Sequence, residues 1–141
     1  MNKRVLLSVC GRQKYLDQEP DTIELVTEGT MEFRDGGWDI CYNESELTGL
    51  AGVTTNFRVE SDKIVLTRTG KLNSQMVFQP GVKHVSLYQM EFGALLISVC
   101  ANRIIANLDD LGGMIDLIYD IEIEHSTAGQ VDYHLDVRVI E

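Results

Sequence analysis

Hydrophobic and polar residues alternate along most of the chain, and this alternation indicates β-strands with one buried and one solvated face. The pattern is clearest near the C-terminus, where the odd-numbered residues from Ile115 to Ile123 and from Val131 to Val139 are apolar or aromatic. Most of the even-numbered residues between them are charged. No segment repeats its hydrophobic residues with the period of about 3.6 that an amphipathic helix shows. We therefore expect an all-β protein.

Turn residues divide this pattern into about ten strands, placed at 3–13, 22–34, 38–47, 53–60, 64–70, 74–79, 82–91, 94–108, 115–124 and 131–139. Turns are expected at 35–37, 61–62, 92–93 and 127–129, and loops at 15–21, 48–52, 71–73 and 109–113. The strand 94–108 is largely apolar, so it should be buried on much of both faces or bent part-way. In 82–91, Tyr88 and Met90 are assigned to the inner face, although Val85 and Leu87 favour the opposite assignment.

The short connections favour antiparallel hairpins between consecutive strands. A sheet of this size with one apolar face curls and closes on itself, which also removes exposed strand edges. We therefore predict one domain, 1–141, that folds as a closed or nearly closed up-and-down antiparallel β-barrel of about 8–10 strands. A two-sheet sandwich is the alternative, but sandwiches usually need longer crossover connections.

The charge balance narrows the expected partners. The chain carries 12 Lys and Arg against 22 Asp and Glu, a net charge of −10. An acidic surface repels nucleic-acid phosphates and anionic lipids, so neither nucleic acid nor a membrane is an expected partner. The N-terminal apolar run is too short for a secretory signal, and no run is long enough to span a membrane as a helix. We expect a cytoplasmic protein that is a monomer or a weak homodimer.

One predicted strand, 64–70, carries a charged residue on an otherwise apolar face, because Ile64, Leu66 and Arg68 share one side of it. By this alternation, seven polar or tyrosine residues point inward, Arg68 among them. Thr27 is one, and the other six form the candidate ligand site: Tyr42, Glu44, Thr55, Arg68, Tyr88 and Tyr119.

A buried Arg68 needs a partner, and Glu44 is the natural one. The alternative places both residues at the barrel rim in solvent, where they would form at most a weak surface pair. The position of Arg68 near the end of its strand favours the rim. The three tyrosines, on the same grounds, are expected to be core or rim aromatics more often than ligand contacts.

Other chemistry has little support in the sequence. The widely spaced cysteines, Cys10, Cys41 and Cys100, lie among apolar residues, which favours buried free thiols in a reducing compartment. On the outer face of the last two strands, a row of carboxylates with His134 could hold a divalent cation. That row comprises Asp116, Asp120, Glu122, Glu124, Asp132 and Asp136. A flat strand face seldom wraps an ion, so a solvated exterior is expected. No motif assigns a catalytic residue, a metal site or a cofactor.

Several short motifs resemble the YwiB-like family, small proteins mainly of Gram-positive bacteria with no established function. The motifs are Tyr42-Asn43-Glu44, Thr54-Thr55, Arg68-Thr69-Gly70, Tyr88 with Phe92-Gly93, and Leu117-Ile118-Tyr119. The resemblance covers most of the chain and implies a calycin- or lipocalin-like β-barrel in the cytoplasm. It implies no catalytic or ligand residues, and fold alone does not determine function.

Three hypotheses about function follow. The first is a non-enzymatic barrel that binds a small, partly apolar and perhaps anionic ligand beside Arg68. The second is a solid barrel that acts as a protein-interaction or structural module. The third is an enzyme that uses Glu44 as an acid or base near Arg68.

Overall fold

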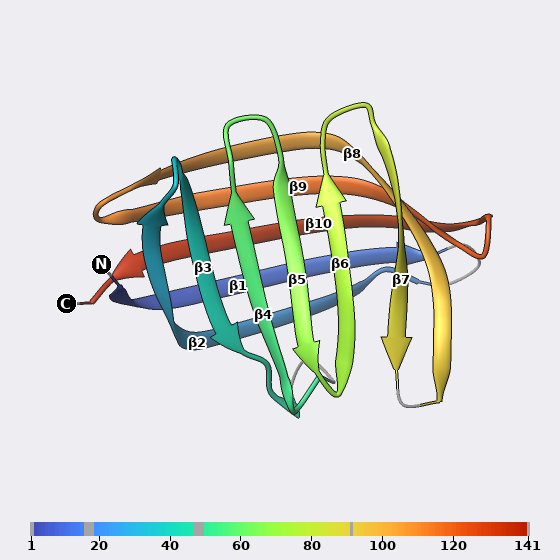
Figure 1. Cartoon of the computed structure of the whole chain (residues 1–141), viewed down its shortest axis with the longest axis horizontal. Helices are drawn as coiled ribbons and strands as arrows, with labels where there is room; N and C mark the ends of the chain where they lie inside the picture. The colour runs from blue at the N-terminus through green and yellow to red at the C-terminus, as the bar shows by residue number, and fades with distance from the viewer. Residues whose placement is uncertain (1, 16–18, 47–49, 91, 141) are drawn as a thin grey trace.

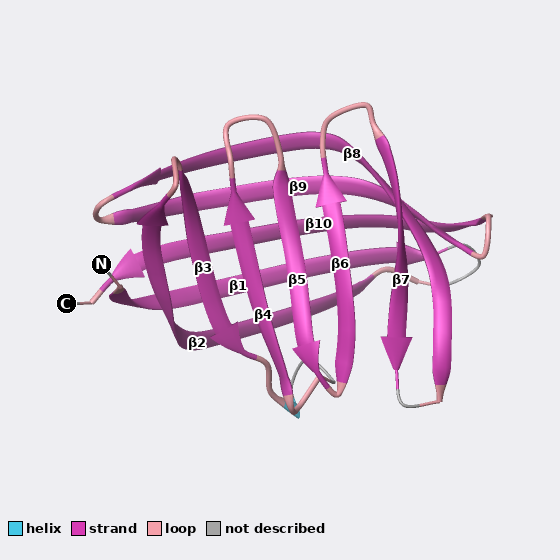
Figure 2. Ribbon diagram, viewed as in Figure 1, coloured by secondary structure: helices cyan, strands magenta, loops and turns pink. Residues whose placement is uncertain are grey.

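Ten antiparallel strands close into a single barrel in the order β1-β10-β9-β8-β7-β6-β5-β4-β3-β2 (Figure 1). The computed structural model describes residues 2–15, 19–46, 50–90 and 92–140. The strands are β1 (Lys3–Tyr15), β2 (Asp21–Arg34), β3 (Gly37–Asn43), β4 (Val53–Val59), β5 (Ile64–Gly70), β6 (Leu72–Phe78), β7 (Lys83–Met90), β8 (Gly93–Asp109), β9 (Gly112–Ile123) and β10 (Ser126–Val139). Strands make up nearly all of the molecule (Figure 2). The predicted all-β antiparallel barrel is confirmed, and the sandwich alternative is wrong.

The barrel is flattened into two layers whose strands cross at a steep angle (Figure 1). The strands β1, β9 and β10 run along the long axis, whereas β3 to β7 run across it. The long strands β2 and β8 bend and so contribute to both layers. The predicted bend of β8 is thus confirmed, and this strand also has a register shift against β9 between Ala101 and Arg103, an irregularity of the kind that bends a strand.

Gly29 lets β2 and β3 approach each other closely. It pairs with Val5 of β1 on one side and with Tyr42 of β3 on the other. A Cβ atom at this position would lie 2.4 Å from the carbonyl oxygen of Cys41. Only glycine permits so close an approach of β3 at this position.

The middle of the barrel is filled by inward-pointing apolar side chains from both layers. Seven of those in the described residues have no exposed surface: Val5, Leu7, Ile40, Phe57, Phe78, Ile115 and Leu135. Interiors packed in this way leave few voids as large as a water molecule. The cavities described below accordingly lie toward the two ends of the barrel.

The seam between β6 and β7 is the least regular junction of the barrel. Among the described residues, these strands pair only at Leu72 with Met90 and at Asn73 with Gln89. The neighbouring strands β7 and β8, by contrast, pair from Lys83–Cys100 to Met90–Gly93. The facing edges of β6 and β7 therefore lack ladder hydrogen bonds over most of their length.

Several predicted boundaries are wrong at the strand ends. The predicted loop 71–73 contains the start of β6 at Leu72. The predicted loop 15–21 contains the end of β1 and the start of β2. The predicted strand 38–47 ends at Asn43, and the loop 109–113 includes the start of β9. The last turn lies at Glu124 and His125, with φ of 51° and 68°, and not at 127–129, where β10 has begun. The parts of the predicted elements that fall on 16–18, 47–49 and 91 lie outside the described residues.

The two β7 residues whose orientation the pattern left open point outward. Val85 is 56% exposed and Leu87 is 51% exposed. Tyr88, one position further, is half-buried and lines the interior, as assigned from the sequence.

Candidate functional site

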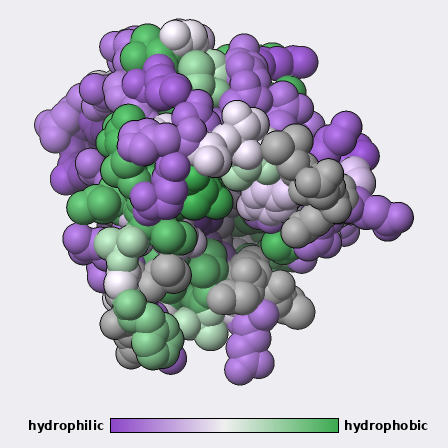
Figure 3. Space-filling model, turned by 90° about the vertical axis from the view of Figure 1, so that its right-hand side faces the viewer, coloured by the Kyte–Doolittle hydropathy of each residue, from purple (hydrophilic) through white to green (hydrophobic). Residues whose placement is uncertain are grey.

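Five of the six predicted site residues line one cavity of about 270 Å³ toward one end of the barrel. They are Tyr42, Glu44, Arg68, Tyr88 and Tyr119. The sixth, Thr55, is fully buried and donates a hydrogen bond to Glu44. Figure 3 views the molecule toward this end, where hydrophobic side chains (green) lie among hydrophilic ones (purple). The fold thus brings together side chains that are far apart in the sequence and that strand alternation had assigned to the inner face.

Arg68 and Glu44 lie inside the barrel, so the interpretation that placed them at the rim is wrong. Their side chains are 15% and 2% exposed, and Arg68 Nε lies 3.9 Å from Glu44 Oε2. The physical reason is the two-layer shape: tyrosines of the opposite layer and Leu50 of the β3–β4 connection enclose the end of β5. The end of a strand is therefore not the edge of the interior.

Glu44 accepts a hydrogen bond in this interior pair, whereas Arg68 Nε donates none among the described residues. Thr55 Oγ1 donates to Glu44 Oε2 over 2.5 Å. Arg68 Nε, in contrast, is buried without a hydrogen-bond acceptor among the described residues, and the ion-pair distance of 3.9 Å is too long for a hydrogen bond. Ser74 Oγ, on the residue of β6 that pairs with Arg68, is likewise buried without a partner among the described residues, but Ser74 does not line the cavity. Arg68 does line it and thus offers a donor that an acceptor on a ligand would satisfy.

A pair of tyrosine hydroxyls completes the polar lining. Tyr42 Oη and Tyr133 Oη lie 2.9 Å apart. Burial raises the pKa of Tyr42 to about 12, with a further contribution from the charge of Glu44. Burial also raises the pKa of Tyr133 and of Tyr119 well above the ordinary value, while Arg68 acts in the opposite direction on both. All three hydroxyls therefore stay protonated near neutral pH and can donate hydrogen bonds.

Tyr133 was missing from the predicted site. The alternation in 131–139 places it on the inner face, and its ring packs against Phe57 with centroids 5.5 Å apart. Its depth along the barrel, which brings it beside Tyr42, depends on the register of β10 and on the crossing of the two layers. Nothing local in the sequence signals either.

A second cavity of about 230 Å³ adjoins the first and shares Gln13, Arg68, Tyr88, Tyr119 and Val131 with it. Its remaining lining is mostly apolar: Tyr15, Met76, Leu95, Ile97, Ile121 and Ile123. We call the two cavities together the Arg68 site. It combines one buried cation and several phenols with an aliphatic wall.

The other predicted chemistry stays outside this site. The three cysteines are free, as predicted, but each is only partly buried. Burial raises the pKa of the Cys41 thiol, which disfavours the nucleophilic thiolate. No group of three or more metal-ligating side chains occurs in the part of the chain that the structure describes.

The outer carboxylates of β9 and β10 lie near basic side chains. Asp116 lies 3.8 Å from Arg103 and 3.9 Å from His134, and Lys83 pairs with Glu122 at 2.8 Å. These are surface ion pairs of low individual strength.

Within the described ranges, no helix is long and apolar enough to cross a membrane.

Comparisons with known proteins agree with the predicted resemblance. Over 107 residues the chain is 25% identical to "Uncharacterized beta-barrel protein YwiB" of Bacillus subtilis (strain 168), which covers 76% of this chain and 74% of that protein. The crystal structure of the YwiB protein from Bacillus subtilis superposes with a TM-score of 0.83 at 21% identity, covering 96% of this chain and 92% of the other. The family model described as "Domain of unknown function (DUF1934)" matches residues 7–135. The chain therefore belongs to the DUF1934 family of β-barrel proteins that includes YwiB-like members.

Proposed function

We propose that this barrel is a non-enzymatic binding protein that holds a small carboxylate with an aromatic or otherwise apolar body in the Arg68 site. The observation that carries the proposal is the buried Arg68 Nε without an acceptor, in the wall of a cavity with room for a ligand. Leaving a buried donor unsatisfied costs about 1–3 kcal/mol, and more for a charged group. A carboxylate oxygen at Nε would recover that cost, and the planar guanidinium matches the geometry of a carboxylate.

The walls support the apolar part of this ligand. Tyr42, Tyr88, Tyr119 and Tyr133 provide aromatic faces, and Leu95, Ile97 and Ile121 provide an aliphatic one. Ligand sites are usually mostly apolar with a few polar groups that fix orientation. The cavities of about 270 and 230 Å³ limit the ligand to a small molecule.

Glu44 sets the charge preference of the site. It lies on one side of the Arg68 guanidinium and is itself held by Thr55. A monoanionic ligand that approaches from the cavity shares Arg68 with Glu44, whereas a dianion would add a second repulsive charge in an enclosed space. The site therefore favours a single carboxylate over a phosphate.

The expected setting of this function is the cytoplasm, with the protein acting as a monomer or weak homodimer. The lipocalin-like architecture expected from the sequence supports ligand binding by analogy of fold only. The alternative of a protein-interaction module draws on the outward-facing Val85 and Leu87, which leave apolar surface exposed on β7. Nothing in the arrangement of Glu44 specifically favours the enzymatic alternative.

Binding of phenylacetate tests the proposal. Titration followed by NMR should shift the resonances of the Arg68 guanidinium and the Tyr119 ring, while the uncharged analogue phenylacetamide should bind at least about tenfold more weakly. The double variant Glu44→Gln/Arg68→Met removes the cation without leaving a buried unpaired charge, and it should abolish the preference for the acid. Equal binding of the acid and the amide by the native protein would refute the role of Arg68.

A further inference from the structure

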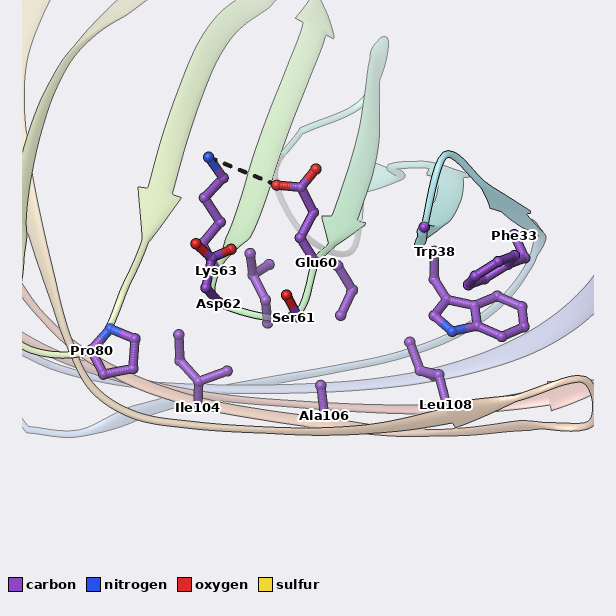
Figure 4. Close-up of a pocket in the computed structure, with 13 residues that line it drawn as sticks. Phe33, Trp38, Glu60, Ser61, Asp62, Lys63, Pro80, Ile104, Ala106 and Leu108 are labelled. Atoms are coloured by element: carbon purple, nitrogen blue, oxygen red, sulfur yellow. Dashed lines mark ion pairs between the residues drawn. The ribbon is translucent and has the colours of Figure 1, made fainter.

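A groove of about 410 Å³ lies toward the other end of the barrel, between the β4–β5 turn and β8 (Figure 4). It shares no lining residue with the Arg68 site. The packed middle of the barrel separates the two. We call it the Trp38 groove, and its lining comprises Phe33, Gly36, Trp38, Val59, Ile64, Pro80, Ile104, Ala106, Leu108 and the turn residues 60–63.

The floor of the groove is a row of aliphatic residues on β8. Ile104, Ala106 and Leu108 point inward after the register shift, but the opposite layer covers them only partly. Figure 4 shows them in line beneath the turn that carries Ser61 and Asp62. Four residue steps along a strand span about 13 Å. The small side chain of Ala106 at the centre leaves the groove open along this length.

Aromatic and imino-acid rings mark the two ends of the floor. Trp38 lies beyond Leu108, and its indole meets the ring of Phe33 edge to face at a centroid distance of 4.9 Å. Phe33 is 54% exposed, which is unusual for a large aromatic side chain unless something covers it. Pro80 lies beyond Ile104 at the other end. The shape suits an elongated molecule with a flat ring at the Trp38 end.

The cations beside the groove already have carboxylate partners. Glu60 lies between two of them, with Lys63 Nζ at 3.7 Å and Arg58 Nε at 3.4 Å. Arg58, which lies behind the lining, also pairs with Asp39 at 3.1 Å. Among the described residues, this wall has no buried charged donor without an acceptor, in contrast to Arg68 Nε at the Arg68 site. A charged ligand would lose hydration here without gaining a dedicated partner.

From these features we infer that the Trp38 groove is a second binding site, which takes an uncharged, elongated and mainly apolar small molecule whose ring stacks near Trp38. Its volume falls within the range of about 300–1,000 Å³ that is typical of ligand sites. The aliphatic floor on β8 and the rings of Phe33 and Trp38 supply apolar surface, and the turn residues 60–63 supply polar groups along one side. This inference is independent of the proposed carboxylate site, since neither the residues nor the charge requirement are shared.

A matched pair of dyes tests the inference on the full chain. N-phenylnaphthylamine is uncharged, and anilinonaphthalenesulfonate carries the same two ring systems with one added sulfonate. Binding is followed by dye fluorescence, and its location by NMR shifts of the Trp38 indole N–H, which is unique because the chain has one tryptophan, and of the Ala106 methyl group. We expect the uncharged dye to shift both signals and to bind about tenfold or more tightly in the groove than the sulfonate.

The variant Ala106→Phe fills the centre of the groove and should weaken N-phenylnaphthylamine binding by about tenfold or more. Ile105→Phe is the matched control, because the neighbouring residue of β8 points to the outer face. Should Ala106→Phe fail to fold, Ala106→Val adds less volume at the same place and should give a smaller loss. Unchanged shifts of Trp38 and Ala106, a preference of the groove for the sulfonate, or equal effects of Ala106→Phe and Ile105→Phe would each overturn the inference.

Discussion

Removal of the Arg68 guanidinium should destabilise the fold because it leaves Glu44 as an uncompensated charge in the interior. The Glu44 side chain is 2% exposed, and breaking a buried ion pair by removing one partner costs about 3–5 kcal/mol. The separation of 3.9 Å is long for this class of pair, so we expect the lower end, ~3 kcal/mol, for Arg68→Met. Glu44→Gln should cost less, ~1–2 kcal/mol, because the amide can still accept from Thr55 and Arg68 keeps some contact with solvent.

The double variant Glu44→Gln/Arg68→Met should be more stable than the sum of the single effects predicts. With both charges gone, neither needs a partner, so the total loss should stay near ~1–2 kcal/mol. The expected interaction energy of the pair is then ~3 kcal/mol, at the upper end for neighbouring residues. Equilibrium unfolding in urea, followed by Trp38 fluorescence, measures all four free energies.

The surface pair Arg103 and Asp116 provides the control for this cycle. Its closest atoms lie 3.8 Å apart, nearly the same distance, but the side chains are 56% and 21% exposed. An equivalent cycle with Arg103→Met and Asp116→Asn should give less than about 1 kcal/mol. If the Glu44–Arg68 cycle is additive, or couples no more strongly than this surface pair, the argument that burial makes Arg68 dependent on Glu44 is wrong.

Three further predictions concern the fold around the sites. Because the pKa of Tyr42 is 10.0 when unfolded and about 12 when folded, the stability it contributes should be complete below pH 10.0 and lost as the pH rises to about 12. The stability–pH curve should fall less steeply there in Tyr42→Phe, with a residual slope from the raised pKa values of Tyr119 and Tyr133, and an unchanged curve would contradict the burial argument. Gly112→Ala should destabilise the fold by several kcal/mol in thermal unfolding, since φ is 117° and a Cβ would lie 2.1 Å from the carbonyl oxygen of Val137. The control Gly81→Ala, with φ of 76° and open surroundings, should cost only about 1 kcal/mol, and similar losses in the two variants would be inconsistent with this steric account. In β6, hydrogen exchange should be faster for the amides of residues 74–78 that face β7 than for the amides that bond to β5. Equal protection of the two sets would show that the junction between β6 and β7 is closed in solution.

Strand alternation predicted the fold well because each strand of a closed barrel has one face inward, and period two identifies that face. The inward placement of Tyr42, Glu44, Arg68 and Tyr119 follows from this rule alone. The same rule gives no position along the barrel axis. Alternation therefore does not distinguish a rim position of Arg68 from an interior one. The position of Arg68 near its strand end favoured the rim, which is wrong.

The two-layer crossing, by contrast, was not predicted. It depends on bends in β2 and β8, and the sequence indicated only the bend in β8, as one of two alternatives for its apolar run. The crossing brings Tyr133 to Tyr42 and leaves Ala106 only partly covered, so it creates both the missed site residue and the Trp38 groove. A pattern of apolar residues identifies what is buried, but which buried side chains meet depends on these bends.

Native mass spectrometry of the protein purified from its own host tests the central proposal most directly. The wild-type protein should carry a bound small molecule whose mass disappears on denaturation, and which chemical analysis identifies as a monocarboxylate. The folded double variant Glu44→Gln/Arg68→Met, purified in the same way, should lack it. A wild-type mass equal to that of the polypeptide alone, together with no affinity for phenylacetate, would contradict a ligand-binding role of the Arg68 site.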